Sequence, residues 1–515
     1  MKTVLLLLLI LMSALLGACA TNPVTGENEL ALVSESSELE IGRKQYAPSR
    51  QMQGGDYTVD PSLNSYVQSV GKRLAAVSDR KLPYEFVVVN DSSPNAWALP
   101  GGKIAINRGL LVELQNEAEL AAVLGHEIVH AAARHSAQGI ERGMLLQGAL
   151  AAVGVAAQNS GYADLAAGAA GIGANLINQR YSREAELESD HFGMIYMQRA
   201  GYDPQAAIGL QETFVRLSGS KDQNWLAGLF ASHPPSPERV AKNRENAARM
   251  GKGGTLGRQV YQRKIAGLKR SKPAYAAYDK GVKVLQKQPA EALKLANKAI
   301  SIESREGLFY GLRGDAYYNL KEPKMARKAY DQAIRLNPNF FRPYLKRGVV
   351  RSESGDESGA RSDLKKSLQL LPTADAHYYL GRIAQSEGDP RTARAHYKVA
   401  SGSRSAAGKA AAREMASMGQ PNNPGRNLDT VLGLDRSGTL MVRVTNNTGA
   451  AVRDPAVLVG RRDASGSIYR GREYQLQGVL APGKSLDFKS AIRGLRSRNQ
   501  LREFDARVVR AVPVK

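Results

Sequence analysis

The residues of this 515-residue chain that are best suited to chemistry cluster at positions 123–137, which hold three of its seven histidines. His126 and His130 are four residues apart, so on an α-helix both imidazoles project from one face and can share one Zn²⁺ ion. Glu127 is offset by one residue, which places its carboxylate to take a proton from the water that the metal acidifies. This H-E-x-x-H spacing predicts a metallopeptidase site with Glu127 as the general base.

The residues around this motif predict a buried helix. The stretches ELAAVLG before it and AAA after it are apolar, and Gln115 or Asn116 is the expected N-cap. Buried imidazole and carboxylate groups need partners, and a metal ion suits both. His135 follows His130 by five residues on the same expected helix, so we expect it to point away from the metal and to support the site from outside or to be structural.

A hydrolytic zinc site needs a third protein ligand and an open fourth position. The extended H-E-x-x-H-x-x-G-x-x-H pattern is not met, because Ser136 stands at the position of its last histidine. The third ligand is therefore expected from a downstream acidic helix, on which Glu186 and Asp190 share one face. One carboxylate that binds the metal and a second that orients a histidine is a common pairing, while Glu184 and Glu188 compete for the ligand role by composition alone.

H-E-x-x-H followed by E-x-x-x-D at Glu186 and Asp190 resembles the HtpX, Oma and CAAX prenyl protease family of zinc metallopeptidases. The resemblance covers roughly residues 22–250 and includes the segments NPVTGE, NAWALPGGKIAINRGLL, AGYDP and SHPPSPERV. It implies a mainly α zincin-like domain with a small β-sheet, one zinc ion per chain, Glu186 as the third ligand and Asp190 as its supporting residue. It also implies that the strand near Asn95 and Ala96 borders the cleft, where an extended peptide could add to the sheet edge.

His233 opens the element H-P-x-x-x-x-R in the segment SHPPSPERV, which resembles the same family. One interpretation is that His233 approaches the open position of the metal and helps to bind the transition-state oxyanion. A second is that it plugs this position as a latch, and a third is that it only caps local structure around the two prolines that follow it. Binding of one zinc ion by this histidine together with His126, His130 and Glu186 would favour the latch.

The first 18 residues predict a signal peptide. Lys2 precedes an apolar run that is short for a membrane span, and small residues lead to Cys19 in LGAC. This order resembles the bacterial lipoprotein signal, in which Cys19 becomes the acylated first residue; the alternative is an ordinary secreted protein in which this cysteine is incidental. Cys19 is the chain's one cysteine, so no disulfide is expected within it. By resemblance to lipoprotein sorting rules, Ala20 favours the outer membrane, facing the periplasm.

The charge of +23 is unevenly distributed. Residues 1–250 hold 21 Lys+Arg against 25 Asp+Glu, whereas residues 251–515 hold 50 against 23. This asymmetry predicts separate domains with separate partners. A basic surface suits acidic phospholipid, lipopolysaccharide, cell-wall polymer or nucleic acid, and export argues against nucleic acid. A solvated basic surface without a specific partner is the other interpretation.

An internal repeat follows residue 272. Four glycines recur at intervals of 33 or 34 residues: Gly281, Gly314, Gly348 and Gly381. After three of them an alanine follows at twelve residues and a tyrosine or leucine at sixteen. This unit resembles the tetratricopeptide repeat, a helix pair that stacks into a solenoid whose concave face binds peptides or partner proteins. The expected partner is a substrate protein or the outer-membrane assembly machinery.

Two further segments have a distinctive composition. Residues 143–179 are rich in Gly, Ala and Leu with almost no charge, which favours two closely packed helices; a hydrophobic lip that touches lipid or unfolded substrate is the alternative. From residue 437 onward, runs with a period of two alternate with Gly-containing turns, which predicts a small immunoglobulin-like β-sandwich.

The predicted fold class is therefore multidomain. The expected domains are a lipoprotein signal peptide (1–18), a lipidated N-terminal segment (19–59), a zinc metallopeptidase domain (60–250), a basic linker (251–272), tetratricopeptide repeats (273–406), a second linker (407–436) and a β-sandwich (437–515).

The predicted function is that of a lipid-anchored zinc endopeptidase of the bacterial cell envelope. It would hydrolyse misfolded or unassembled envelope proteins, with the repeats recruiting a substrate or a partner. The alternative is a chaperone or scaffold lipoprotein with a latched zinc site that acts in outer-membrane assembly. A third hypothesis is that the basic C-terminal half binds cell-wall polymer or lipopolysaccharide.

Overall fold

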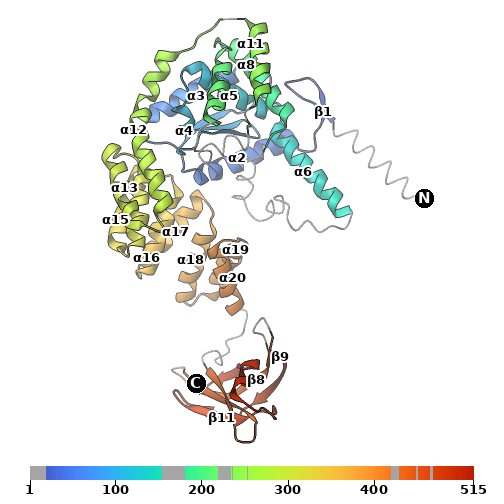
Figure 1. Ribbon diagram of the computed structural model, residues 1–515, viewed down its shortest axis with the longest axis vertical. Helices are drawn as coiled ribbons and strands as arrows, with labels where there is room; N and C mark the ends of the chain where they lie inside the picture. Colours follow the sequence, from blue (N-terminus) through green and yellow to red (C-terminus); the bar gives the residue numbers. More distant parts are fainter. Residues whose placement is uncertain are drawn as a thin grey trace, which may run out of the picture. The chain divides into compact units, whose positions relative to one another are not determined.

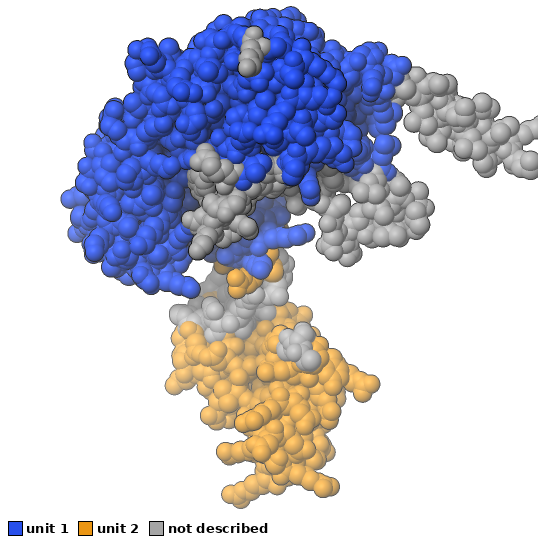
Figure 2. All heavy atoms as spheres, turned by 45° about the horizontal axis from the view of Figure 1, so that its top comes forward, with its two compact units in different colours: residues 1–411 blue, residues 412–515 orange. Residues whose placement is uncertain are grey.

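The computed structural model divides into two compact units, residues 1–411 and 412–515 (Figures 1 and 2). The residues that it describes are 19–152, 180–218, 233–234, 236–251, 253–418, 428–447, 451–463 and 468–514. The predicted signal peptide and most of the Gly/Ala-rich segment lie outside them. None of the helices in the described ranges is long and apolar enough to cross a membrane.

The sheet nearest the predicted site has three strands in the order β3-β5-β4. They are β3 (Glu85–Val89), β4 (Ala96–Leu99) and β5 (Lys103–Asn107). β5 runs parallel to β3 and antiparallel to β4. The tight turn from β4 to β5 uses Gly101 and Gly102, whose φ angles of 75° and 79° lie in the left-handed region. The chain leaves β5 directly into a short helix, α4 (Arg108–Leu111).

Both faces of this sheet are buried, because its side chains alternate between two apolar cores. Ile104 and Ile106 of β5 belong to the larger core, and Ala105 between them belongs to the smaller one. Helices α3 and α5 cover the first face and α2 covers the second (Figure 1). Their bounds are α2 (Glu35–Met52), α3 (Pro61–Ala75) and α5 (Glu117–Ala132).

The H-E-x-x-H motif lies on α5, and the predicted acidic helix is α8 (Arg183–Arg199). The two helices touch where Gly125 meets Gly193. A Cβ atom added to Gly193 would lie 3.0 Å from the backbone nitrogen of His126 and 3.2 Å from the carbonyl carbon of Gly125. Because neither glycine carries a side chain, the helix backbones approach closely, and the residues of α8 near Gly193 face the motif.

Helix α5 ends earlier than the sequence predicted. Asn116 caps its start by accepting a hydrogen bond from a backbone N–H of the first turn. The helix stops at Ala132, Arg134 takes a positive φ of 63°, and α6 (His135–Ala152) begins at the next residue. The expectation that His135 shares a helix with His130 is therefore wrong. The break places the His135 ring beside the His130 ring, although His135 is not among the four grouped ligand residues.

Arg134 stabilises this break through ion pairs with three carboxylates. These are Glu29 at 2.9 Å, Glu38 at 2.7 Å and Glu141 at 3.2 Å. Glu38 lies on α2, and Glu29 lies on the second strand of an antiparallel pair, β1 (Cys19–Thr21) and β2 (Asn28–Leu30). The segment expected as a lipidated leader is thus folded onto the domain that carries the motif.

The repeat region consists of four helix pairs, followed by α20 (Ala406–Met418). The pairs are α12 (Arg258–Val284) with α13 (Pro289–Ile302), α14 (Gly307–Asn319) with α15 (Pro323–Leu336), α16 (Phe341–Glu353) with α17 (Glu357–Leu370), and α18 (Ala374–Ser386) with α19 (Pro390–Ser401). Most of the segment 251–272, which we expected to be a linker, belongs to α12.

The repeated glycines lie where paired helices cross. An added Cβ would approach the residue sixteen positions later: from Gly314 to the Tyr330 ring at 2.4 Å, from Gly348 to Leu364 at 2.9 Å, and from Gly381 to the Tyr397 ring at 2.6 Å. The spacing read from the sequence is therefore the spacing of the helix contact. Each glycine makes room for the large side chain of its partner helix.

The second unit contains two small sheets that share one apolar core. The first holds β6 (Leu428–Leu434), β7 (Leu440–Asn446) and β11 (Ser485–Lys489); in the second, β8 (Val452–Arg462) pairs with β9 (Ile468–Gln475), β10 (Val479–Leu480) and β12 (Phe504–Pro513). The predicted β domain is present, and its first strand begins at residue 428, within the expected second linker.

Replacing Gly193 by valine should push α8 away from α5, because the added side chain would meet backbone atoms that cannot rotate aside. We expect overpacking to lower the free energy of unfolding by about 1–3 kcal/mol, measured by urea denaturation of the full chain. The control is Gly311→Ala in α14, where no heavy atom lies within 4 Å of an added Cβ. That variant should be as stable as the parent or slightly more so. Equal stability of Gly193→Val and the parent would contradict the close approach.

Candidate metal centre

Four side chains from three parts of the first unit converge on one point. His126 and His130 come from α5, Glu186 from α8, and His233 from the residues just before α11 (Pro237–Met250). One ligand atom from each lies within 4.8 Å of the others, and all four residues are at most 9% exposed. The structure thus brings together the three residues predicted as ligands and adds His233 to them.

The distances between these ligand atoms suit a small cation with tetrahedral coordination. Nε2 of His126 lies 3.0 Å from Nε2 of His130 and 3.3 Å from Nδ1 of His233. Oε1 of Glu186 lies 2.9 Å from Nδ1 of His233 and 3.4 Å from Nε2 of His130. Four ligand atoms at about 2.0–2.1 Å from a zinc ion would lie about 3.3–3.4 Å from one another. The donor set and its size therefore fit one zinc ion.

Asp190 orients His126. Its Oδ1 lies 2.9 Å from Nδ1 of His126, so the Nδ1–H donates to the carboxylate and the Nε2 lone pair faces the centre. Arg239 of α11 pairs with Asp190 at 2.7 Å, and the side-chain amide of Asn243 donates to it at 3.3 Å. Burial would raise the pKa of Asp190, but Arg239 and His126 outweigh it and hold that pKa below its usual value.

His130 is held by aromatic and polar neighbours. Its Nδ1 lies 2.8 Å from Nδ1 of His135, and its ring stacks on Tyr181 with centroids 3.8 Å apart. The Tyr181 hydroxyl and Ser136 share a hydrogen bond of 2.9 Å. Burial lowers the pKa of His130 well below its usual value, so the imidazole is neutral, which is the form that binds a metal.

Glu186 is a buried carboxylate that stays ionised. Its Oε2 pairs with Arg239 at 2.7 Å. Burial would raise the pKa of Glu186, but its interactions with His233, His126 and Arg239 outweigh burial and hold the pKa well below its usual value. A carboxylate that remains charged at this depth suits the role of a metal ligand.

Glu127 differs from Glu186 because it lacks a firm partner. It is 2% exposed, and its Oε2 has no hydrogen-bond partner among the described residues. Its Oε1 lies 3.6 Å from Nε2 of His233. Burial raises the pKa of Glu127, against the opposing charges of His233 and His126. A carboxylate with a free oxygen and a raised pKa is suited to accepting and returning a proton.

The charges around the centre call for a cation. The carboxylates of Glu127, Glu186 and Asp190 are all at most 7% exposed, and one arginine, Arg239, lies among them. Two negative charges are left over when all three carboxylates are ionised. A divalent ion would neutralise them, which is a second reason why these residues fit zinc.

Two competing carboxylates lie elsewhere. Glu184 is exposed at the start of α8. Oε1 of Glu188 lies 3.3 Å from Nε2 of His135 and does not join the four converging ligand atoms. Of the acidic residues on α8, Glu186 alone is among the residues grouped at the centre within the described part of the chain.

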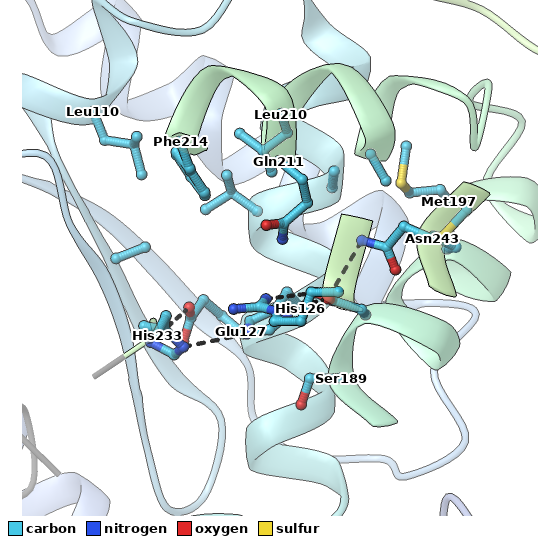
Figure 3. Close-up of a pocket in the computed structure, with 17 residues that line it drawn as sticks. Leu110, His126, Glu127, Ser189, Met197, Leu210, Gln211, Phe214, His233 and Asn243 are labelled. Atoms are coloured by element: carbon cyan, nitrogen blue, oxygen red, sulfur yellow. Dashed lines mark hydrogen bonds and ion pairs between the residues drawn. The ribbon is translucent and has the colours of Figure 1, made fainter. Parts of the chain in front are cut away.

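A largely apolar pocket opens beside the centre. Figure 3 shows Leu110, Leu210 and Phe214 along one side of it, and His126, Glu127 and His233 along the other. Leu210 and Phe214 belong to α9 (Ala206–Ser218), which packs against α5. The arrangement offers an apolar side chain a place next to the residues that would do the chemistry.

Sequence reasoning did not assign a role to three residues that shape the centre: Arg239, Asn243 and Tyr181. Arg239 is the arginine of the H-P-x-x-x-x-R element, so the element itself contained the information. Tyr181 and Asn243 stand in no motif that the sequence analysis used. Their roles arise from packing between helices that are distant in sequence.

Glu186→Ala should remove the one carboxylate ligand of the centre, whereas Glu184→Ala removes an exposed carboxylate two residues away. We expect the first variant to be purified with less than about a tenth of the parent's zinc, since a lost ligand costs more than the 10–100-fold typical of an outer partner. The second variant should keep its zinc. The measurement is zinc per chain by atomic emission; equal zinc in both variants would remove Glu186 from the ligand set.

Comparison with known proteins supports this geometry. Residues 61–247 match the sequence profile of peptidase family M48, and residues 308–340 match that of the tetratricopeptide repeat. The β-barrel assembly-enhancing protease of Escherichia coli strain K12 is 30% identical over 236 residues, 42% of this chain and 46% of that protein. This chain thus spans less than half the length of such relatives.

Two other relatives match about a third of the chain. Mitochondrial metalloendopeptidase OMA1 of Schizosaccharomyces pombe is 37% identical over 182 residues, 35% of this chain and 52% of that protein. Metalloprotease YcaL of Escherichia coli strain K12 is 34% identical over 190 residues, 35% of this chain and 70% of that protein. With its grouped histidines and carboxylate, and with most of a related metalloprotease covered, the chain belongs to peptidase family M48.

Proposed function

We propose that the chain is a zinc endopeptidase of the bacterial cell envelope. The observation that carries this proposal is the convergence of His126, His130 and Glu186 beside Glu127, a buried carboxylate with an oxygen that no described residue occupies. The names of its relatives, a β-barrel assembly-enhancing protease among them, support a role in the envelope.

In the proposed mechanism, His126, His130 and Glu186 would hold a zinc ion, which would supply Lewis acidity for the activation of water and of the scissile carbonyl. Glu127 accepts the proton of the attacking water at its free Oε2 and returns it to the nitrogen of the departing amine. Asp190 and Arg239 keep His126 in the tautomer that leaves Nε2 free for the metal. Burial of the whole group excludes bulk water and strengthens these electrostatic contacts.

The surroundings of the centre support an extended polypeptide as the substrate. β4 is one of the two edge strands of its sheet in the described part of the chain, and its first residue, Ala96, lines the apolar pocket. An extended peptide could pair with this edge and place an apolar side chain in the pocket. Misfolded or unassembled envelope proteins present such segments, whereas folded ones bury them.

We propose that Cys19 anchors the chain in the outer membrane, on the periplasmic side. Support comes from the lipoprotein-like order of residues before this single cysteine and from the exported character of the family resemblance. Behind the peptidase domain, the proposed tetratricopeptide repeats would recruit a substrate or the assembly machinery. The proposed immunoglobulin-like β domain would bind a partner or act as a spacer. The basic charge of the C-terminal half would suit an anionic envelope polymer.

A scaffold function is the second candidate, and the position of His233 favours it. Its Nδ1 lies 2.9 Å from Glu186 and 3.3 Å from Nε2 of His126, which is where a fourth ligand would stand. A histidine in this place would close the centre as a latch, and the repeats would then do the work.

Lipidation at Cys19 predicts that cells grown with a radioactive or clickable palmitate label the parent chain and not Cys19→Ser. The variant should also lose its membrane fraction and appear in the soluble periplasmic extract. Equal labelling of the two proteins would contradict the anchor, and an unlabelled parent would favour the ordinary secreted alternative.

Glu127→Gln should keep zinc within about a factor of two and lose casein cleavage by about 10³-fold or more, because the amide cannot accept a proton. Zinc content and the rate of casein hydrolysis by the full chain are the measurements. His191→Gln on α8, a histidine outside the centre, serves as the control with unchanged cleavage. Persistent casein cleavage by Glu127→Gln would contradict the mechanism. Full rescue of a deletion strain by that variant would favour the scaffold function.

The same casein assay separates the roles of His233. If it is a latch, His233→Ala should raise the cleavage rate severalfold. If it binds the oxyanion, the variant should lose about 10²-fold in kcat with little change in KM. An unchanged rate would leave this residue only a structural role at the end of the domain.

A further inference from the structure

His135 contacts the metal centre but takes no part in the mechanism above. It starts α6, directly after the break at Arg134, and its Nδ1 lies 2.8 Å from Nδ1 of His130. Both rings are buried, with exposures of 2% and 0%. The break at Arg134 creates this contact. It holds a non-glycine residue in the left-handed conformation, which is energetically unfavourable.

The protons in this pair can be assigned from the partners. His130 needs an unprotonated Nε2 to bind a metal, so its proton must be on Nδ1. This N–H then donates to Nδ1 of His135, which must be unprotonated to accept it. The proton of His135 is therefore on Nε2. Oε1 of Glu188 lies 3.3 Å from this nitrogen, so its carboxylate favours a proton there through charge and not through a hydrogen bond. The tautomers of His130 and His135 are thus each set by the neighbouring group.

The acceptor for the Nδ1–H of His130 differs from the acceptor for the Nδ1–H of His126. There the acceptor is the carboxylate of Asp190, whose charge is matched by Arg239. Behind His130 the acceptor is a neutral imidazole, and the carboxylate is one residue further out, at Glu188, which is about one-quarter exposed. The centre thus gains an orienting acceptor without another buried charge beside it.

We propose that His135 is a positioning residue that holds His130 in its metal-binding tautomer and orientation, with Glu188 fixing the tautomer of His135. The proposal rests on the proposed zinc site. It predicts that the hydrogen-bond acceptor at the Nδ1 position of His135 raises zinc affinity, and that the size and polarity of the side chain alone do not.

Two amide variants test this. In His135→Asn the amide oxygen stands near the position of Nδ1 and can accept from His130, so zinc affinity should stay within about threefold of the parent. In His135→Gln the amide reaches toward the position of Nε2 and the acceptor for His130 is lost. Zinc affinity should then fall by about 10–100-fold. Affinity is measured on the full chain by competition with a fluorescent zinc chelator.

The repeats offer a matched control. His377 and His396 form a similar pair with their Nδ1 atoms 3.0 Å apart, far along the chain from the metal centre. His377→Gln should leave zinc affinity unchanged. Melting temperatures of the metal-free proteins serve as the second control, because a purely structural role of His135 would lower them in both amide variants.

Glu188→Leu gives a test that does not touch either histidine. This half-buried side chain can be replaced with little risk to folding, and zinc affinity should fall by about threefold to tenfold. Full zinc affinity in His135→Gln, or an equal loss in His135→Asn and His135→Gln, would overturn the proposal. A parent chain that binds no zinc would instead overturn the proposed function on which the proposal rests.

Discussion

The metal centre depends on one close contact between two helices. Gly125 and Gly193 let the backbones of α5 and α8 approach closely. A Cβ atom on Gly125 or Gly193 would lie only 3.1 or 3.0 Å from backbone atoms of the other helix, so the two helices would have to move apart. Because Glu186 lies about two turns and Asp190 about one turn before Gly193, this contact decides whether a carboxylate reaches the histidines of α5.

Burial then determines how the charges must be arranged. Glu127, Glu186 and Asp190 cannot all remain ionised in an apolar domain unless cations stand beside them. Arg239 supplies one from α11, and the donor set suits a divalent ion for the rest. The helix that carries this arginine also follows His233, so the same segment contributes a charge that stabilises the centre and a side chain that can close it.

The repeats are joined to the domain that carries the H-E-x-x-H motif by buried polar contacts within the first unit. Glu306 accepts hydrogen bonds from Asn90 at 2.9 Å and from Tyr275 at 2.6 Å. The guanidinium of Arg108 lies 3.3 Å above the Tyr275 ring. Asn90 and Arg108 flank the strands of the small sheet, so a polypeptide held by the repeats, as we propose, would be presented to a domain that is directly connected to them.

The sequence by itself determined the local features of this protein. The spacing of His126 and His130 requires only helical geometry, and the interval between Gly314 and Tyr330 is that of a helix-pair contact, so both could be read without a fold. The C-terminal β domain was likewise visible as a period of two, although its sheet pairing was not. Tertiary structure alone decided that Asp190 meets His126, that Arg239 neutralises it, and that His135 turns back to His130. Those contacts join residues on separate helices, or across a left-handed residue that no periodicity reveals, and their distances depend on packing that only the folded chain creates.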